Sequence, residues 1–339
     1  MPKCGTQVIL CDLPVRFDTY KGCTHGCKYC FASKFNDISN VETDETVKAL
    51  RNWIDGVRSR ENAWCDWNIP LHFGGMSDPL QPIEKKVRNT YECLKLLEET
   101  QYPFLISTKG KLLGDDEYLE VIGKCNCVVQ ISAVCGSYDE IEPGAPTFLE
   151  RIEIGRKDAS TGRRLIFRIQ PYLPEHFEEI KESLKLMADA GAYGVIIEGM
   201  KYSKKRKGLV RVTGDWCIDY KTIKHDFLIL KEIGNGLGMK VYAGENRLRE
   251  YGDSLTCCGI DGLEGFKPNT FNINHLIHGE KVFPSETMCK VGTAACFQSL
   301  NQTASMSEVV RKNSFANMML GYLKKKRKMV SEIFGMAYK

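Results

Sequence analysis

Short runs of strand-forming residues alternate with amphipathic helical segments through the first 244 residues of the chain. Each helical segment carries one apolar stripe, as residues 83–99 show with Val87, Tyr91 and Leu94 at three- and four-residue spacing. Helices with one apolar face cover one side of a parallel sheet, and repeated strand–helix units close partly or fully into a barrel. We therefore predict an α/β fold, a partial (β/α) barrel of about six or seven parallel strands with its chemistry at their carboxyl ends.

The predicted elements divide the chain into two parts. Strands are expected at residues 16–20, 70–73, 104–108, 128–133, 165–170, 194–198 and 240–243. Helices are expected at residues 45–58, 83–99, 175–190 and 220–233. After residue 244 the alternation stops, so we take residues 1–244 as the barrel core. Residues 245–339 are an irregular, cysteine-containing C-terminal extension that ends in a basic helical tail.

Composition narrows the class of protein. The 339 residues are 43% hydrophobic and 27% charged, which is the balance of a soluble globular protein. The sequence has no apolar run of about eighteen residues and no secretory leader, so we expect a cytoplasmic protein without a membrane anchor. Fifteen cysteines then favour ligation or catalysis over disulfides. A net charge of +4 is too small to indicate nucleic-acid binding by itself.

Three cysteines closely follow the first expected strand, in the stretch KGCTHGCKYCFA. Cys23, Cys27 and Cys30 form a C-x3-C-x2-C pattern on one short loop, whereas a structural zinc site normally has four ligands. Thiolates ligate iron–sulfur clusters, and three of them leave one iron of a [4Fe-4S] cluster open to chelate S-adenosylmethionine. Tyr29 is then placed to pack against the adenine. The alternative is a zinc loop completed by His25 or by a remote residue.

Further segments in the same order resemble the radical S-adenosylmethionine superfamily and, within it, the spore photoproduct lyase-like branch. The resemblance covers roughly residues 15–260 and rests on KGCTHGCKYCFA, HFGGMSDPLQPIE (72–84), LISTKG (105–110), VQISAV (129–134), EPGAPTFLERIE (142–153) and GENRLREYGDSLTCCG (244–259). It implies an enzyme that reductively cleaves S-adenosylmethionine to a deoxyadenosyl radical. An external electron donor such as flavodoxin or ferredoxin is implied with it, and the oligomeric state is left open.

The resemblance also implies cofactor contacts. The segment containing Gly74 and Gly75 is expected to contact the amino group of the bound methionine moiety, because glycine lets backbone approach a ligand closely. Ser77, Lys109 and Ser132 match a hydroxyl, an ammonium for the carboxylate and a strand-end hydroxyl for the ribose. Spore photoproduct lyases carry their hydrogen-returning cysteine at the position of Gly75. Modification or isomerisation is therefore a better expectation than dimer repair.

Other polar residues fall near the ends of expected strands. Arg168 is a candidate for holding the cofactor carboxylate, as is Arg151, and the alternative for each is a surface ion pair. Gln170 and Glu198 are expected to line the pocket without an assigned role. Asp78 precedes a proline, so it either belongs to the site or fixes a turn.

The C-terminal extension contains four more cysteines of interest, Cys257, Cys258, Cys289 and Cys296. Together they are candidates for a second iron–sulfur cluster or a zinc site, which would give order to a segment with little apolar periodicity. Cys257 or Cys258 is alternatively a catalytic hydrogen-atom donor to a substrate radical. The third alternative is buried or free thiols.

Two basic runs bear on the substrate. Lys204, Lys205 and Arg206 follow the sixth expected strand, in a loop that overhangs the active face and contacts phosphates, or else is an ordinary solvated loop. Residues 324–328 lie in the tail, where cations complement a helix dipole. The leading function is hydrogen abstraction from a nucleic acid or nucleobase-derived substrate. The second is peptide or protein modification with an auxiliary iron–sulfur cluster, and the third is a non-catalytic cluster-binding protein.

Overall fold

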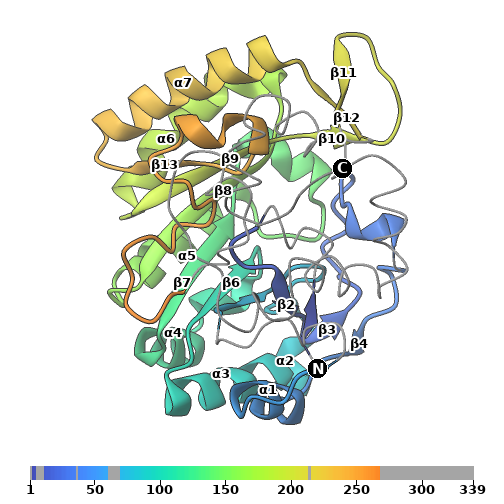
Figure 1. Ribbon diagram of the computed structural model, residues 1–339, viewed down its shortest axis with the longest axis vertical. Coiled ribbons are helices and arrows are strands. Elements are labelled where there is room, and N and C mark those ends of the chain that lie inside the picture. Colours follow the sequence, from blue (N-terminus) through green and yellow to red (C-terminus); the bar gives the residue numbers. More distant parts are fainter. Residues whose placement is uncertain (1, 5–10, 36, 60–68, 213–214, 268–339) are drawn as a thin grey trace, which may run out of the picture.

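A curved sheet of eight strands forms the centre of the computed structural model, which describes residues 2–4, 11–35, 37–59, 69–212 and 215–267. Its strand order is β1-β2-β5-β6-β7-β8-β9-β13 (Figure 1). These strands are β1 (Lys3–Cys4), β2 (Val15–Phe17), β5 (Leu71–Phe73), β6 (Phe104–Thr108), β7 (Cys127–Ser132), β8 (Arg164–Tyr172), β9 (Gly194–Gly199) and β13 (Lys240–Ala243). Neighbours from β2 to β13 pair in parallel, and β1 pairs antiparallel with β2. The predicted partial (β/α) barrel is confirmed.

The strands form where the sequence has continuous apolar runs, which is typical of a parallel sheet covered on both faces. All five residues of β6 are buried. The strands predicted at residues 104–108 and 240–243 match β6 and β13. The first predicted strand, at residues 16–20, is wrong in length, because β2 ends before Asp18 and the chain turns into β3 (Tyr20–Lys21), which pairs with β4 (Glu42–Thr43). The Asp18 carboxylate accepts a hydrogen bond from the Met76 amide (2.8 Å), which fixes this turn.

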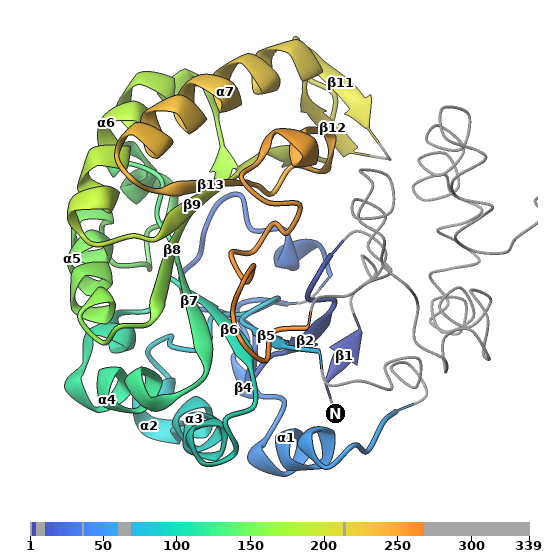
Figure 2. The same ribbon diagram turned by 60° about the vertical axis from the view of Figure 1, so that its left-hand side comes forward.

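Helices cover the outer face of the sheet (Figure 2). They include α1 (Val47–Ile54), α3 (Asn89–Thr100), α4 (Asp116–Lys124), α5 (Phe148–Ala159), α6 (Phe177–Asp189) and α7 (Tyr220–Gly236). Their starts follow local rules, since Thr147 and Glu150 form a capping box at α5 and Asp219 caps α7. Their apolar stripes pack against the sheet in a continuous core. No helix in the described part of the chain is long and apolar enough to cross a membrane.

The single helix predicted over residues 83–99 is wrong, because the chain turns at Arg88 (φ 58°) and separates α2 (Glu84–Val87) from α3. The cause is Glu84, which is buried and accepts hydrogen bonds from the Thr90 and Tyr91 amides (2.9 and 2.8 Å). A carboxylate that satisfies the free amides of the next helix stabilises its start. To place Glu84 there, the chain has to turn between the two helices.

A later segment of the chain fills the concave face of the sheet (Figure 2). After β13 come the 3₁₀ helix η5 (Asn246–Tyr251) and residues 254–267, which cross that face. Val128 of β7 belongs to one apolar cluster with Ile260 of this segment. A polar contact also joins the two, because the Gln130 side-chain amide donates a hydrogen bond to the Cys258 carbonyl (2.9 Å). Residues 254–267 of the predicted C-terminal extension therefore lie inside the curved sheet.

A small antiparallel sheet follows β9 and contains the first basic run (Figure 1). Its strands are β10 (Lys201–Tyr202), β12 (Asp215–Ile218) and β11 (Leu209–Val212), hydrogen-bonded in that order. The three cations expected in a loop lie in residues 203–208, which connect β10 to β11, and the short strands on either side of this loop were not predicted. Because β10 begins directly after β9, this sheet starts at the carboxyl end of the parallel strands.

Candidate functional site

The three cysteines of the C-x3-C-x2-C pattern lie on a loop that follows β3, just beyond the carboxyl end of β2. Cys23, Cys27 and Cys30 are free thiols and half-buried. Backbone hydrogen bonds anchor the loop, from the Cys23 amide to the Ile38 carbonyl and from the Lys28 amide to the Ile141 carbonyl (2.9 Å each). Burial raises the pKa of Cys23 to about 12 and also raises that of Cys27. Metal binding at this loop therefore has to displace thiol protons.

The segment 77–81 packs against this cysteine loop and holds it. Gln81 clamps two loop residues, since its Nε2 donates to the Gly22 carbonyl (3.1 Å) and its Oε1 accepts from the Thr24 amide (3.0 Å). Ser77, a predicted cofactor contact, is buried and donates to the Tyr20 carbonyl (2.5 Å). Its hydroxyl therefore fixes the backbone that leads into the loop. Sequence reasoning missed Gln81, whose only signal is its place within the segment HFGGMSDPLQPIE.

Asp78 joins the cysteine loop to the end of β6. Its carboxylate accepts hydrogen bonds from the Lys109 amide and the Thr108 hydroxyl (2.6 Å each) and lies 3.1 Å from Nε2 of His25. The other ring nitrogen of His25 lies 3.0 Å from the Gly144 carbonyl oxygen. Burial opposes ionisation of Asp78, but the charge and hydrogen bond of His25 and the other donors lower its pKa to about 2. Burial likewise opposes protonation of His25, and Asp78 nevertheless raises the pKa of that ring.

Glu142 brings hydroxyl and cationic groups together beside the loop. Its carboxylate is buried and accepts a hydrogen bond from the Tyr29 hydroxyl. It pairs with Arg151 (Nη1 to Oε2, 2.5 Å) and lies 3.7 Å from Nζ of Lys109. Arg151 is fully buried and also donates to the Ser132 carbonyl (2.8 Å), so a surface ion pair is excluded for this arginine. Sequence reasoning missed Glu142, although it begins the segment EPGAPTFLERIE.

Three predicted cofactor contacts therefore lie around one corner of the sheet. Nζ of Lys109 lies 5.6 Å from the centre of the Tyr29 ring, and Ser132 is the last residue of the neighbouring strand β7. Burial raises the pKa of Tyr29 well above its ordinary value, so its phenol stays neutral and donates to Glu142. The cysteine loop, the end of β6 and the end of β7 form a single polar corner.

Gly74 and Gly75 follow β5 at the same edge of the sheet. Gly74 has φ +79°, and a Cβ there would lie 2.2 Å from the Ser107 carbonyl oxygen. A Cβ on Gly75 would lie 2.6 Å from Cδ of Arg16. The first glycine permits a close approach of two backbones, and the second leaves room for the arginine stem. A cysteine at position 75 would compete with Arg16 for space.

A ladder of polar side chains crosses the concave face behind this corner. Nε2 of His72 lies 2.9 Å from the Ser107 hydroxyl, which donates to Oε1 of Gln130 (3.0 Å). Arg168 donates to the same hydroxyl (2.9 Å). Burial lowers the pKa of His72 to about 3, so its ring is neutral. Sequence reasoning missed His72, Ser107 and Gln130, although polar residues within otherwise apolar strands are a signal for an interior polar network.

The ladder continues to β9. Arg168 also donates to Oε1 of Gln170, whose Nε2 donates to Glu198 (2.6 Å). Glu198 in turn pairs with Lys201 at the start of β10. Arg168, Gln170 and Glu198 thus belong to one network, and their contacts with a cofactor or substrate stay predictions.

The second cysteine group differs in composition from the expected one. The Sγ atoms of Cys257 and Cys258 and a carboxylate oxygen of Asp12 all lie within 4.8 Å of one another. Cys11 interacts with the Cys257 thiol. Hydrogen bonds from Cys11 and Cys258 lower the pKa of Cys257 well below its ordinary value. The other two predicted ligands, Cys289 and Cys296, lie outside the described residues.

The cations of the first basic run are exposed on the connection between β10 and β11. Nζ of Lys205 lies 5.6 Å from the centre of the Trp216 ring. The guanidinium carbon of Arg206 lies 4.7 Å from the centre of the Tyr202 ring. Lys204 is exposed beside them. The β10–β11 connection, together with β10 and β12, therefore presents cations and aromatic rings. The second basic run, at residues 324–328, lies outside the described part of the chain.

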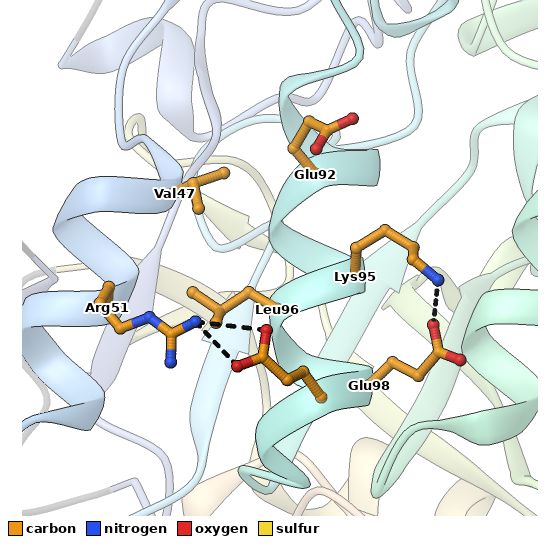
Figure 3. A pocket seen from close by; sticks show the side chains of 7 residues that line it. Val47, Arg51, Glu92, Lys95, Leu96 and Glu98 are labelled. Atoms are coloured by element: carbon orange, nitrogen blue, oxygen red, sulfur yellow. Dashed lines mark hydrogen bonds and ion pairs between the residues drawn. The ribbon is translucent and has the colours of Figure 1, made fainter.

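A groove of about 530 Å³ lies between α1 and α3 (Figure 3). It is lined by Val47, Arg51, Glu92, Lys95, Leu96, Glu98 and Glu99. Four of its charged side chains form ion pairs, since Arg51 pairs with Glu99 (3.1 Å) and Lys95 pairs with Glu98 (2.6 Å). The lining contains no predicted site residue, so this groove on the helical side is separate from the polar corner.

Comparison with models of known protein families gives no match. Among curated proteins, the uncharacterized proteins Rv2578c of Mycobacterium tuberculosis (strain H37Rv) and Mb2609c of Mycobacterium bovis are each 27% identical to this chain over 212 residues. The similar region covers 58% of this chain. The chain spans 62% of the length of these relatives.

Solved structures of spore photoproduct lyase are similar to this chain. A mutant with dinucleoside spore photoproduct superposes with a TM-score of 0.57 at 14% identity, over 68% of this chain and 76% of the lyase. A mutant with both AdoMet and dinucleoside spore photoproduct gives a TM-score of 0.55 at the same identity and coverage. The chain therefore shares the fold of spore photoproduct lyase. The resemblance predicted from the sequence is confirmed at the level of the fold.

Proposed function

We propose that this chain is a radical S-adenosylmethionine enzyme that holds a [4Fe-4S] cluster on Cys23, Cys27 and Cys30. The observation that carries the proposal is the position of three free thiols on one anchored loop at the carboxyl end of a parallel sheet. Such ends carry the chemistry of (β/α) barrels. When bound and reduced, the cluster and S-adenosylmethionine supply a deoxyadenosyl radical that abstracts hydrogen from a substrate.

The donor set fits a cluster better than a single zinc ion. Two groups among the described residues bring three candidate ligand atoms within 4.8 Å of one another, and Cys23, Cys27 and Cys30 are in neither. Each thiolate of a cubane binds a different iron, so wider spacing is suitable for a cluster. His25, the fourth ligand of the zinc alternative, directs its ring nitrogens to Asp78 and to the Gly144 carbonyl.

The residues around the cysteine loop are suited to binding the amino-acid and ribose parts of the cofactor. Lys109 carries an ammonium that Glu142 holds next to Tyr29, which places a positive charge for a carboxylate. Ser132 offers a hydroxyl at the carboxyl end of β7. The close backbone approach at Gly74 leaves main-chain groups near the same edge. These three contacts with the cofactor are part of the proposal.

We further infer a nucleic-acid or nucleobase-derived substrate. Exposed cations bind phosphates, and aromatic rings stack on bases. The small sheet of β10, β12 and β11 carries both kinds of group next to the carboxyl end of β9. The similar lyase binds dinucleoside spore photoproduct. Gly75, packed against Arg16, favours modification or isomerisation over dimer repair. An electron donor such as flavodoxin or ferredoxin supplies the reducing electron.

A second candidate is peptide or protein modification with an auxiliary iron–sulfur cluster. The observation that favours it is the thiol group of Cys257 and Cys258 inside the sheet, next to a carboxylate. Both candidate functions use the same cluster on Cys23, Cys27 and Cys30 and differ only in the substrate. Incubation with DNA, RNA and peptide mixtures, followed by mass spectrometry of each, decides between them.

The core of the proposal is tested by anaerobic reconstitution with iron and sulfide. The wild-type chain should bind about four irons per cluster and form deoxyadenosine from S-adenosylmethionine under a strong reductant. Replacement of Cys23, Cys27 and Cys30 by Ala should abolish that product. Cys125→Ala, at a fully buried core thiol, is the matched control and should retain it. Undiminished deoxyadenosine from the triple variant, or bound zinc without iron–sulfur absorption, would contradict the proposal.

A further inference from the structure

Two segments far apart in the sequence meet in the concave face of the sheet, at Asp12 before β2 and at Cys257 and Cys258 after η5. Asp12 is fully buried and Cys258 is 8% exposed. One carboxylate oxygen and two Sγ atoms lie within 4.8 Å of one another there. A tetrahedral zinc ion about 2.0–2.3 Å from each ligand atom holds those atoms about 3.3–3.8 Å apart, so a contraction of at most about 1.5 Å brings this group to single-ion spacing.

The surrounding structure already holds the cysteine-bearing segment in place. The Gln130 amide donates to the carbonyl of Cys258, and Arg164 donates to the carbonyls of Gly259 and Asp261 (2.7 Å each). Leu13, the neighbour of Asp12, belongs to the same apolar cluster as Cys258. Both halves of the group are therefore fixed by contacts that do not involve their ligand atoms.

The charge of the group also suits a bound divalent cation. Cys11 interacts with Cys257 from outside the group of atoms within 4.8 Å, and with it the set has three thiols and one carboxylate. Such a set with a divalent ion has two negative charges in excess. Arg249, which is 2% exposed, and Arg168 both interact electrostatically with Cys257 and can offset that excess. Buried charges are stable when paired in this way.

We propose that Asp12, Cys257 and Cys258, with Cys11 as the fourth ligand, form a second metal site that takes a single zinc ion. Thiolate sulfur and carboxylate oxygen are ordinary ligands of tetrahedral zinc. The ion joins the segment before β2 to the segment that fills the concave face, and so stabilises the interior of the sheet. This site shares no residue with the cysteine loop, so it does not rest on the proposed activity.

A second group of candidate ligands, Cys135, His176 and Glu179, does not support a comparable site. Its three ligand atoms also lie within 4.8 Å of one another. However, both oxygens of Glu179 already accept hydrogen bonds from Ser137, one from its amide (3.0 Å) and one from its hydroxyl (2.6 Å). That carboxylate has a structural role as it stands.

The test is metal analysis of the full chain, purified anaerobically from zinc-containing medium. The wild type and the variant with Ala at positions 23, 27 and 30 should each retain about one zinc per chain. The double variant Cys257→Ser and Cys258→Ser should lose it, while Cys125→Ala should retain it. Asp12→Asn, the milder variant, should weaken the binding of cobalt, a spectroscopic substitute for zinc, by at least about 10-fold.

Cobalt spectra identify the ligands, because sulfur-to-cobalt charge-transfer bands appear only with thiolate ligation. They should be present in the triple alanine variant and absent from the Cys257/Cys258 double variant. If the wild type binds neither zinc nor cobalt, or if the double variant keeps its zinc, the proposal is wrong. Iron and sulfide in place of zinc in the triple alanine variant would also overturn it, in favour of an auxiliary cluster. Circular dichroism of each variant separates metal loss from misfolding, and for a misfolded double variant the Asp12→Asn titration decides.

Discussion

The substitution Asp78→Asn tests how the cysteine loop is fixed to the end of β6. Oδ1 of Asp78 accepts hydrogen bonds from the Thr108 hydroxyl (2.6 Å) and the Leu80 amide (2.9 Å). Oδ2 accepts from the Lys109 amide (2.6 Å) and lies 3.1 Å from Nε2 of His25. Asparagine keeps an oxygen at the first position but directs an NH₂ group toward the second pair of donors. Two buried donors then lose their acceptor.

The loss of stability caused by Asp78→Asn should depend on pH, and this dependence identifies the Asp78–His25 ion pair as its cause. Removing one partner of a buried ion pair costs about 3–5 kcal/mol, so the free energy of unfolding should fall by about 3 kcal/mol near pH 5. Asp78 has a pKa of about 2 in place of 3.8, so its contribution is complete above pH 3.8 and is lost as the pH falls toward 2. The lowered pKa of Asp78 contributes about 2 kcal/mol to the free energy of unfolding, at about 1.4 kcal/mol per pKa unit.

The contribution of His25 to the free energy of unfolding changes with pH in the opposite direction to that of Asp78. Because the pKa of His25 is raised in the folded state, its contribution is complete below pH 6.5 and is lost as the pH rises through the folded-state pKa. The difference in stability between wild type and Asp78→Asn should therefore be largest near pH 5 and smaller toward both ends. Urea unfolding of the cluster-free chain, followed by circular dichroism from about pH 3 to about pH 8, measures it. Asp116→Asn, at an exposed position in α4, should change stability by no more than about 0.5 kcal/mol. A difference that is flat with pH, or below about 1 kcal/mol near pH 5, would refute the reasoning.

Other expected outcomes concern the cofactor, position 75 and the basic β10–β11 connection. Lys109→Ala should raise the KM for S-adenosylmethionine by about 10-fold or more without reducing iron content, because one charged hydrogen bond is worth about 1.5–3 kcal/mol. Gly75→Cys should destabilise the chain by about 1–3 kcal/mol in urea unfolding, because the new side chain overlaps Arg16, and should yield no dimer-repair activity in mass spectrometry. Alanine at the three cations of residues 204–206 should reduce the logarithmic salt slope of nucleic-acid binding by about 2–3, with deoxyadenosine formation unchanged. An unchanged slope would instead favour a small nucleotide or a peptide substrate.

Much of the fold could be predicted, because buried parallel strands and amphipathic helices have distinct sequence periods. Residues 104–108 are all apolar or small, and they form β6 as expected. The two wrong boundaries have a common cause. Asp18 and Glu84 are buried carboxylates that bind backbone amides elsewhere in the chain, and each ends or turns a regular element. The periodicity of the sequence does not show such contacts, because the two partners become neighbours only after folding.

The candidate site was predictable to the extent that its residues are close in sequence. Cys23 and Cys30 are on one loop, so their spacing alone indicates a metal site. Asp12 and Cys257 are instead brought together by the packing of residues 254–267 into the concave face. Cys11 stands next to Asp12, but one cysteine without a spaced partner does not indicate a metal site. The sequence therefore predicts partners for Cys257 further along the chain, at Cys289 and Cys296, which lie outside the described residues.

The inner face of β7 explains how two separate metal sites can fit within one curved sheet. Val128 packs in the apolar cluster with Ile260, Gln130 donates to the Cys258 carbonyl, and Ser132 ends the strand at the polar corner. Successive inward residues of a strand are about 6.6 Å apart, so the apolar cluster and the polar corner are separated by about 13 Å. The proposed zinc site belongs to the middle level, where Gln130 binds the cysteine-bearing segment. Loss of that ion should therefore loosen the packing behind the cysteine loop, while Asp78, Gln81 and Glu142 continue to hold the loop itself.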